Sequence, residues 1–211
     1  MMKLFHGHEA HRFPDLYDQM LRLRARVFQD RLGWDVVVSN GREYDEFDEL
    51  NPLYGVALCA RGETVLGSFR LLQTTGPTML GTVFRELLPD GFTVRSPIIW
   101  ESTRFCVDTA AAEVADHGLS SLTGRLLSAV YETGLYAGLS HVVTVIDVRM
   151  ERVMRRAGCP MERLGPVVTI GKVGTVATLV PTTREAVMQI QERNGIVGPC
   201  VSRELVAELA A

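Results

Sequence analysis

Glu101 and Arg104 lie three positions apart inside a largely apolar run, IIWESTRFCV, at positions 98–107. β-Branched and aromatic residues bounded by a proline and by an Asp-Thr pair predict a buried strand. A buried carboxylate or guanidinium without a partner is costly, so these two charges must be neutralised by each other or by a ligand. The run therefore indicates either a structural ion pair at a strand end or a site at which a charged ligand binds and reacts.

The geometry of this strand decides whether the two charges can act together. Side chains alternate between the faces of a regular strand, so Glu101 and Arg104 would point to opposite sides of a sheet. An extra residue reverses that alternation, and such β-bulges are common beside active sites. We therefore expect a bulge near Ser102 and Thr103 that turns both charges toward one cleft.

Hydrophobic periodicity predicts the elements that must position this strand. A first helix over residues 14–32 begins at Pro14, and a hairpin follows. The full set of expected elements after that helix is strands at 54–60, 64–74, 98–107, 141–148, 167–172 and 176–180, helices at 119–136, 148–157 and 181–193, and a short terminal helix capped by Ser202. This order is typical of an α/β fold, a single-domain α-β-α sandwich around a mixed, mostly antiparallel sheet, and by analogy of the GNAT-like acyltransferase architecture.

The N-terminal quarter, about residues 1–51, is predicted to be a mobile arm of a single domain that covers residues 1–211. Its last part, residues 34–51, is rich in acids and has little periodicity, which is typical of a lid or binding loop. Arg70 lies between apolar neighbours on the second hairpin strand and therefore needs an acidic partner from elsewhere in the chain.

Composition restricts the function classes. The 211 residues are 46% hydrophobic and 22% charged, enough for one sizeable core. No apolar run approaches the roughly 20 residues that span a bilayer, and the start, MMKLFHGHEAHRF, lacks the pattern of a signal peptide. We therefore expect a cytoplasmic protein with no membrane span. The net charge of −3 argues against nucleic-acid binding. Four scattered cysteines and three loosely grouped histidines predict no metal site.

The runs RVFQDRLGW, DEFD and WESTRF place eight charged and aromatic residues in order: Arg24, Phe28, Trp34, Asp45, Asp48, Arg70, Glu101 and Arg104. This set, and the chain from about Leu21 to Gly158, resembles the LuxI-type acyl-homoserine-lactone synthases. The resemblance implies that S-adenosylmethionine is a substrate, that no cofactor is needed, and that the donor is an acyl-carrier protein or acyl-CoA. It implies an N-acyl-L-homoserine lactone, a quorum-sensing signal, as product, with methylthioadenosine and the free carrier released.

Roles for the matching residues follow from that implied chemistry. The substrate's α-amine has an ordinary pKa near 8 and is largely protonated at neutral pH, so attack on a thioester needs a base. Glu101 is the candidate base, acting directly or through one water. The substrate's carboxylate must stay ionised and well placed to close the lactone, which suits Arg24 and Arg104 as clamps.

The remaining matches are assigned to binding and anchoring. Phe28 and Trp34 offer aromatic faces for the adenine or the sulfonium cation, and Phe105 is a further expected contact of S-adenosylmethionine. Asp45 and Asp48 are assigned, together with Arg70, to an ion-pair network that anchors the arm on the sheet.

One threonine suggests how the acyl chain is selected. Thr144 is the only small hydroxyl in the apolar strand at 141–148, and in the family an equivalent threonine accompanies donors with a 3-oxo group. Its hydroxyl could donate to that group, although threonine is common in strands and can bond its own backbone. The expected acyl pocket consists of Met79, Thr103, Phe105, Thr144, Met150 and Met154.

A basic helix suggests how a carrier docks. Arg152, Arg155 and Arg156 lie on the helix at 148–157, where the first and last share one face. Carrier proteins are strongly acidic, so this patch is a candidate docking surface; the alternative is an ordinary solvated helix face.

Two other functions remain open from the sequence. A GNAT-type N-acetyltransferase would share the fold, but its pyrophosphate loop should read about R/Q-x-x-G-x-G/A, and residues 108–121 contain only Gly118. The other is a ligand-binding relative that has lost the reaction.

Overall fold

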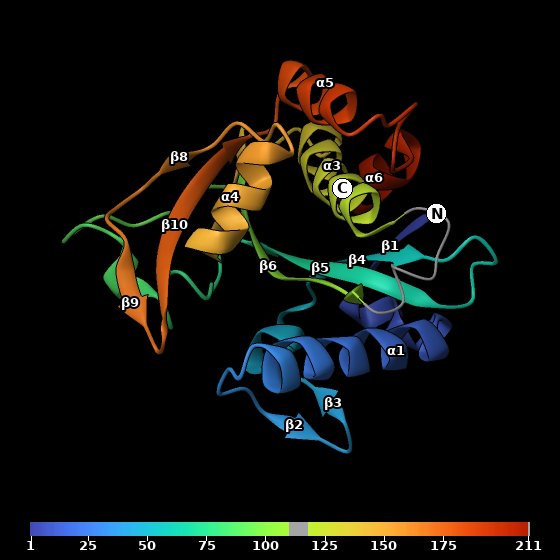
Figure 1. Ribbon diagram of the computed structural model, residues 1–211, viewed down its shortest axis with the longest axis horizontal. Helices are drawn as coiled ribbons and strands as arrows, with labels where there is room; N and C mark the ends of the chain where they lie inside the picture. The colour runs from blue at the N-terminus through green and yellow to red at the C-terminus, as the bar shows by residue number, and fades with distance from the viewer. Residues whose placement is uncertain (110–117, 211) are drawn as a thin grey trace.

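An eight-stranded mixed sheet forms the centre of the computed structural model, which describes residues 1–109 and 118–210 (Figure 1). The strands lie in the order β1-β4-β5-β6-β7-β10-β8, and β9 pairs with β10. Their bounds are Met2–His6 for β1, Leu53–Leu58 for β4, Val65–Gln73 for β5, Ile99–Val107 for β6, His141–Asp147 for β7, Glu162–Arg163 for β8, Val168–Ile170 for β9 and Val173–Pro181 for β10. Among the described strands only β6 and β7 pair in parallel. The predicted α/β fold with a mixed, mostly antiparallel sheet is confirmed.

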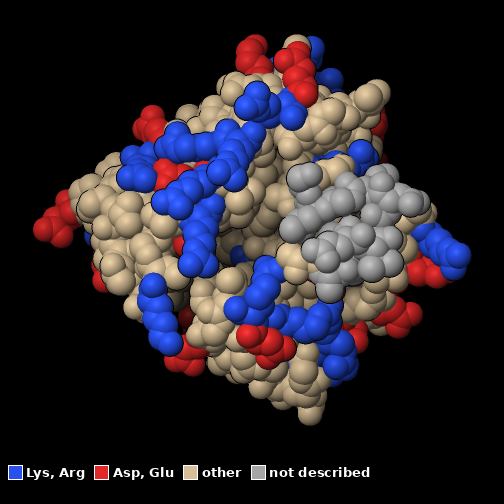
Figure 2. Space-filling view, in the orientation of Figure 1, with Lys and Arg blue, Asp and Glu red and all other residues tan. Residues whose placement is uncertain are grey.

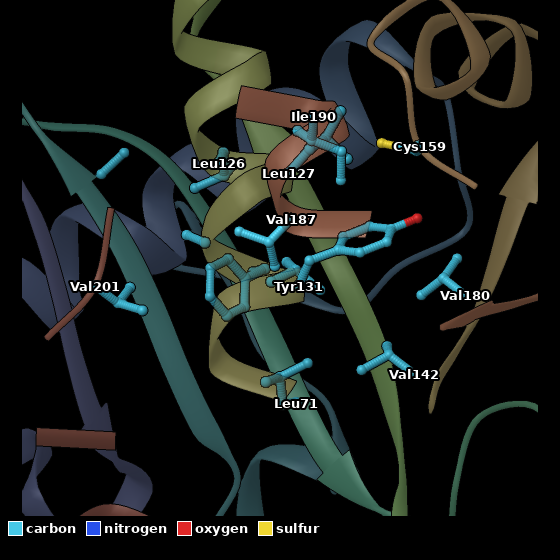
Figure 3. Close-up of a cluster of buried hydrophobic side chains, with 14 of the residues drawn as sticks. Leu71, Leu126, Leu127, Tyr131, Val142, Cys159, Val180, Val187, Ile190 and Val201 are labelled. Atoms are coloured by element: carbon cyan, nitrogen blue, oxygen red, sulfur yellow. The ribbon is translucent and has the colours of Figure 1, made fainter. Parts of the chain in front are cut away.

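Helices cover both faces of this sheet, with α1 on one side and α3, α4, α5 and α6 on the other (Figure 1). Their bounds are Pro14–Arg24 for α1, Gly118–Tyr136 for α3, Val148–Arg156 for α4, Arg184–Arg193 for α5 and Arg203–Ala210 for α6. We refer to the two sides as the α1 face and the α3 face. The larger apolar core lies on the α3 face, where Leu126, Tyr131 and Ile190 meet Val142 of the sheet (Figure 3). The helix order and most boundaries agree with the sequence prediction.

The parallel pair β6–β7 separates part-way along its length. The register runs from Ile99 opposite His141 to Ser102 opposite Thr144, and no pairing continues beyond that point although both strands do. Beyond it, β6 remains paired with its antiparallel partner β5, and β7 remains paired with β10. In this view of the surface, a hollow lies at the centre of the molecule (Figure 2). Residues that follow Ser102 on β6 are therefore freed from one neighbouring strand.

The predicted bulge exists, but it lies one to two residues further along β6. Thr103 pairs with Arg70 and Cys106 pairs with Ser68, so Arg104 and Phe105 together oppose the single residue between them on β5. Arg104 has a left-handed backbone with φ of 53°. This conformation costs a non-glycine residue roughly 1–2 kcal/mol. Such strain persists only where surrounding contacts fix it, and the contacts of the Arg104 side chain supply them.

The predicted N-terminal arm contains more regular structure than its sequence pattern indicated. Met2–His6 form an edge strand that pairs with β4, and Phe5 is fully buried. α1 ends earlier than predicted, because residues 25–31 continue as a π-helix, η2. The acidic segment holds a two-stranded hairpin, β2 (Val38–Ser39) and β3 (Arg42–Glu43), and a 3-10 turn, η3 (Glu46–Leu50). Short edge strands and π-helical turns depend on tertiary contacts, so periodicity did not reveal them.

Smaller features complete the chain. Two more 3-10 turns are present in the described chain. η1 (Gly7–Arg12) precedes α1, and η4 (Arg85–Leu87) lies between β5 and β6. The backbone N–H of Leu205 donates to Ser202 Oγ at 3.2 Å, which confirms the predicted cap of the last helix. The segment 108–121, on which the sequence argument against a GNAT enzyme depends, falls largely outside the described residues. Within the described ranges, no helix is both long and apolar enough to cross a membrane.

Candidate active site

Three arginines and three acids form a buried network on the α1 face. Arg24 of α1 lies at its centre with 1% of its surface exposed. Its Nη1 and Nη2 donate to the two oxygens of Asp48 at 2.9 and 2.8 Å, and its Nε donates to Glu43. The full set is Arg24, Arg70, Arg104, Glu43, Asp45 and Asp48.

The sheet supplies the other two guanidinium groups. Arg70 of β5 donates to Asp45 at 2.5 Å and to Asp48 at 2.8 Å, which confirms that it needed acidic partners. Arg104 of β6 donates to Glu43 at 2.9 Å and forms an ion pair with Asp45 at 2.6 Å. The acidic segment is thus attached to two strands and one helix. Its most distant pair in the sequence, Glu43 and Arg104, is 61 residues apart.

The network is electrically balanced, with three positive and three negative groups. Burial alone would raise the pKa of Asp48, but the hydrogen bonds and charge of Arg24, with the charge of Arg70, hold that pKa well below its ordinary value. Tyr54 adds a hydrogen bond to Asp48 at 2.7 Å. Asp48 therefore stays ionised, and each acid of the network is paired with a guanidinium.

Glu101 lies beside this network but has no cation of its own within ion-pairing distance in the described structure. Its side chain is fully buried. Oε2 accepts a hydrogen bond from the backbone N–H of Met79 at 2.8 Å, and Oε1 accepts one from Leu80 at 2.6 Å. Burial raises the pKa of Glu101 to about 7, although these two N–H donors and the nearby charges of Arg70 and Arg104 lower it. A carboxylate with a pKa near neutrality can accept a proton at physiological pH.

Arg104 connects the network to two aromatic rings. Its guanidinium carbon lies 5.4 Å from the centroid of Phe28, and Phe28 stacks on Trp34 with a centroid distance of 5.2 Å and an angle of 24°. Phe28 is buried, whereas 37% of Trp34 is exposed. The π-helical η2 carries Phe28 and delivers it to this position. A cation and two stacked rings, one open to solvent, can bind a ligand that has both a carboxylate and a flat heterocycle.

Two predicted roles on this face need correction. Arg24, expected to clamp a substrate carboxylate, is enclosed and fully engaged by Glu43 and Asp48, so it belongs to the network that anchors the arm. Met79, expected in the acyl pocket, has its sulfur 3.5 Å from Nη2 of Arg70 and 3.3 Å from Nη1 of Arg104. A methionine sulfur is a weak acceptor. Met79 also packs against Phe47 and Leu72, so it lies on the α1 face between the charged network and a small apolar cluster.

The predicted acyl pocket is divided between the two faces of the sheet. Phe105, Met150 and Met154 lie together in the core of the α3 face. Thr144 shares their face, but its hydroxyl donates to the carbonyl of Ser102 at 2.9 Å. Thr103, like Met79, is on the α1 face, where its Oγ1 accepts from Arg70 at 3.0 Å. Phe105 packs against the core of the α3 face, whereas Phe28 belongs to the apolar cluster of the α1 face, which argues against the expected contact of Phe105 with S-adenosylmethionine.

The predicted basic patch lies on α4. Arg152, Arg155 and Arg156 are exposed, and Arg155 pairs with Glu151 at 2.8 Å. Basic side chains gather over α4 along one edge of the central hollow (Figure 2). The structure adds Arg149, one turn before Arg152, and Arg163, which also pairs with Glu151 at 2.7 Å.

Sequence reasoning missed Glu43. This residue is fully buried and bonds to both Arg24 and Arg104. A count of charges could not have found it, because the predicted site already balanced three arginines with three acids, Asp45, Asp48 and Glu101. Glu43 became necessary only because Glu101 is held by backbone N–H groups and pairs with no arginine in the described structure.

Comparison with known proteins gives this arrangement a context. The sequence model of the family described as autoinducer synthase matches residues 9–190. The chain belongs to the autoinducer synthase family. An acyl-homoserine-lactone synthase from Rhizobium radiobacter is 40% identical over 181 residues, which cover 82% of this chain and 85% of the relative. The expected family is therefore confirmed, and with it an acyltransferase that makes an acyl-homoserine lactone.

Solved structures place this autoinducer synthase among enzymes of the same shape. The AHL synthase LasI aligns with a TM-score of 0.81 at 32% identity and covers 96% of this chain and 97% of its own. BjaI, described as a CoA-dependent acyl-homoserine lactone synthase and solved with SAM and isopentyl-CoA, aligns with a TM-score of 0.82 at 27% identity, with 99% of each chain covered. An acyl-CoA N-acyltransferase from Pseudomonas aeruginosa, at 15% identity and a TM-score of 0.54, shares the fold alone, which agrees with the expected GNAT-like architecture.

Proposed function

We propose that this autoinducer synthase transfers an acyl group from a thioester to the α-amine of S-adenosylmethionine and then closes the lactone, with Glu101 as the base. The observation that carries the proposal is the position of Glu101, a buried carboxylate with a pKa near 7 beside an already neutral network. A carboxylate that has no cation to neutralise is the group in this site best able to take a proton.

The first step joins the two substrates. The amine nitrogen attacks the thioester carbon, the C–S bond breaks, and the carrier leaves as a thiolate. The proton lost by the amine passes to Glu101, directly or through one water. The split between β6 and β7 supports this geometry, because it opens the sheet next to Ser102, the residue that follows Glu101. The donor can then approach from the α3 face while the amine lies on the α1 face.

The second step needs no base. The substrate carboxylate attacks its own γ-carbon, the bond from that carbon to the sulfonium breaks, and neutral methylthioadenosine leaves. Arg104 is the proposed holder of that carboxylate, because it is the least buried of the three network arginines and lies over Phe28. Phe28 and Trp34 are proposed to stack against the adenine or the sulfonium.

The donor's acyl chain is proposed to lie on the α3 face between β7 and α4, against Phe105, Met150 and Met154. The arginines of α4 border the central hollow of the molecule (Figure 2). Their positive charge suits an acidic carrier protein. The relative solved with isopentyl-CoA makes acyl-CoA the second candidate donor. No cofactor takes part in the proposed steps.

Release of labelled methylthioadenosine from S-adenosylmethionine tests the proposal. We expect release only when an acyl donor is present, with stoichiometric formation of the acylated lactone. An acylated amine without methylthioadenosine would indicate an N-acyltransferase of the GNAT type. Binding of S-adenosylmethionine without either product would indicate a non-catalytic relative. Mass spectrometry of the organic extract separates the three outcomes.

A further inference from the structure

The backbone that holds Glu101 belongs to a short turn, residues 78–81, which we call the clamp turn. Met79 and Leu80 provide the two N–H groups that bind the Glu101 carboxylate, at 2.8 and 2.6 Å. Both donors come from consecutive residues, so their aim depends on the conformation of this one turn. What fixes the turn therefore fixes the position of the carboxylate.

Thr78 is the side chain that closes the clamp turn. Its Oγ1 accepts a hydrogen bond from the backbone N–H of Gly81 at 3.1 Å, across the two residues that bind Glu101. Its carbonyl accepts from the hydroxyl of Thr82 at 2.8 Å. Only 6% of Thr78 is exposed. Local bonds of this kind from a threonine hydroxyl hold a backbone in a defined turn.

Gly81 is fitted to the same bond. A Cβ added at Gly81 would lie 2.9 Å from Thr78 Oγ1, closer than real Cβ contacts. The hydrogen bond between the Thr78 hydroxyl and the Gly81 N–H can form at this distance because position 81 has no side chain. This provides a second way to disturb the turn, without changing Thr78.

The clamp turn also separates Glu101 from a small cavity. Thr78, Leu80 and Gly81 line this cavity of about 70 Å³ together with Thr74 and Val143. Val143 is the residue opposite Glu101 in the β6–β7 register. Leu80 packs among Leu87, Leu88 and Val143, and Met79 packs against Phe47 and Leu72. On the cavity side the turn lacks such packing, so its internal hydrogen bonds contribute to its rigidity there.

We propose that Thr78 is a positioning residue for the reaction, which holds the Met79 and Leu80 N–H groups on Glu101 and thereby sets the pH at which that carboxylate becomes a base. This inference rests on the proposed function. Two aimed N–H donors stabilise the ionised form, so a looser turn favours the protonated form. Loss of the Thr78 hydroxyl should raise the pKa of Glu101 and leave less base at neutral pH.

Titration of the Glu101 carboxyl, followed by ¹³C NMR without substrates and assigned with Glu101→Gln, tests the inference directly. In Thr78→Val we expect the titration midpoint to rise by about 0.5 to 1.5 units, the worth of part of a hydrogen bond to a charged group. Gly81→Ala should shift it in the same direction. Thr78→Ser, which keeps the hydroxyl, should restore the wild-type midpoint.

Thr74→Val is the matched control. Thr74 lines the same cavity and is equally buried, but its hydroxyl donates to Ser96 and Ile99 carbonyls at 2.9 and 2.7 Å rather than to the clamp turn. We expect it to lower stability without moving the midpoint. An unchanged midpoint in Thr78→Val, or an equal shift in Thr74→Val, would overturn the inference.

Turnover separates this inference from the function on which it rests. The low-pH limb of kcat/KM for methylthioadenosine release should move with the titration midpoint in Thr78→Val. The substrate's own amine titrates identically with both enzymes, so the difference between the two profiles reports the protein. If the wild-type protein released no methylthioadenosine, the proposed function would fail, while the NMR titration would still decide the role of Thr78.

Discussion

Arg104 and Glu43 are joined by two hydrogen bonds, from Nε and Nη2 of the arginine to the same carboxylate oxygen, at 3.1 and 2.9 Å. Arg24 binds the other oxygen of Glu43. One buried carboxylate therefore connects α1 to β6 and holds Arg104 in its left-handed conformation. The link joins the arm that carries Phe28 and Trp34 to the strand that carries Glu101.

Removing the charge of Glu43 should weaken the fold as well as the site. We expect Glu43→Gln to lower the free energy of unfolding by about 3 to 5 kcal/mol, because it leaves two buried guanidinium groups short of a partner. Urea denaturation measures this. Glu46→Gln changes an exposed acid of the same segment and is the control. Equal stability of the two variants would show that the network does not depend on Glu43.

Glu101→Gln should remove most turnover. The amide cannot accept the amine proton, so we expect methylthioadenosine release to fall about 100-fold or more. The amide nitrogen will also face one of the two backbone N–H donors, so a small loss of stability is expected. Single-turnover assays with saturating substrates measure the chemical step. Turnover near that of the wild type would exclude Glu101 as the base.

The pH dependence of turnover should follow the ionisation of Glu101. The base must be deprotonated, so kcat/KM is expected to rise with pH through about 7. The substrate amine titrates identically with every variant, so comparison of the wild type with Thr78→Val separates the contribution of Glu101 from that of the substrate. A flat profile between pH 6 and 8 would contradict the assigned role.

Stability should change with pH in the opposite sense. The folded protein holds the Glu101 proton up to about pH 7, whereas the unfolded chain releases it near the ordinary value of 4.5. Glu101 therefore destabilises the fold as pH rises through this window. We expect the wild type to lose roughly 2 to 3 kcal/mol relative to Glu101→Gln between pH 5 and 8. Parallel urea titrations at the two pH values provide the measurement.

Charge reversal on α4 tests the carrier surface. We expect Arg152→Glu with Arg156→Glu to raise the KM for a carrier-bound donor and to flatten its salt dependence, with little change for acyl-CoA. Arg184→Glu with Arg203→Glu alters the net charge equally on α5 and α6, where both residues are exposed, and is the matched control. An equal effect with both donors, or with both double variants, would defeat the docking hypothesis.

The structure changes what is expected of Thr144. Its hydroxyl proton is already donated to the Ser102 carbonyl, at the last paired position of β6 and β7. We therefore expect Thr144→Val to lower stability by about 1 to 3 kcal/mol while altering the preference for 3-oxo donors less than about threefold. Competition between 3-oxo and unsubstituted donors of equal length measures this. A larger change in selectivity would restore the role predicted from the sequence.

The sequence by itself determined the element order and the chemistry. Periodicity is a local property, so it located the hairpin, the central strand and the helices with small errors at their ends. The order and types of Arg24, Arg70, Glu101 and Arg104 indicated a charged site, because buried charges are too costly to occur without partners.

Only the tertiary structure decided which charge meets which. Pairing between Glu43 and Arg104 depends on a hairpin, a π-helical turn and a bulge that have little local signal. The same long-range packing enclosed Arg24 and, within the described part of the chain, left Glu101 bound by the backbone N–H groups of Met79 and Leu80. Sequence spacing gives the types of groups that a site contains, but burial and distance, which depend on the whole fold, determine which of them binds, which anchors and which takes the proton.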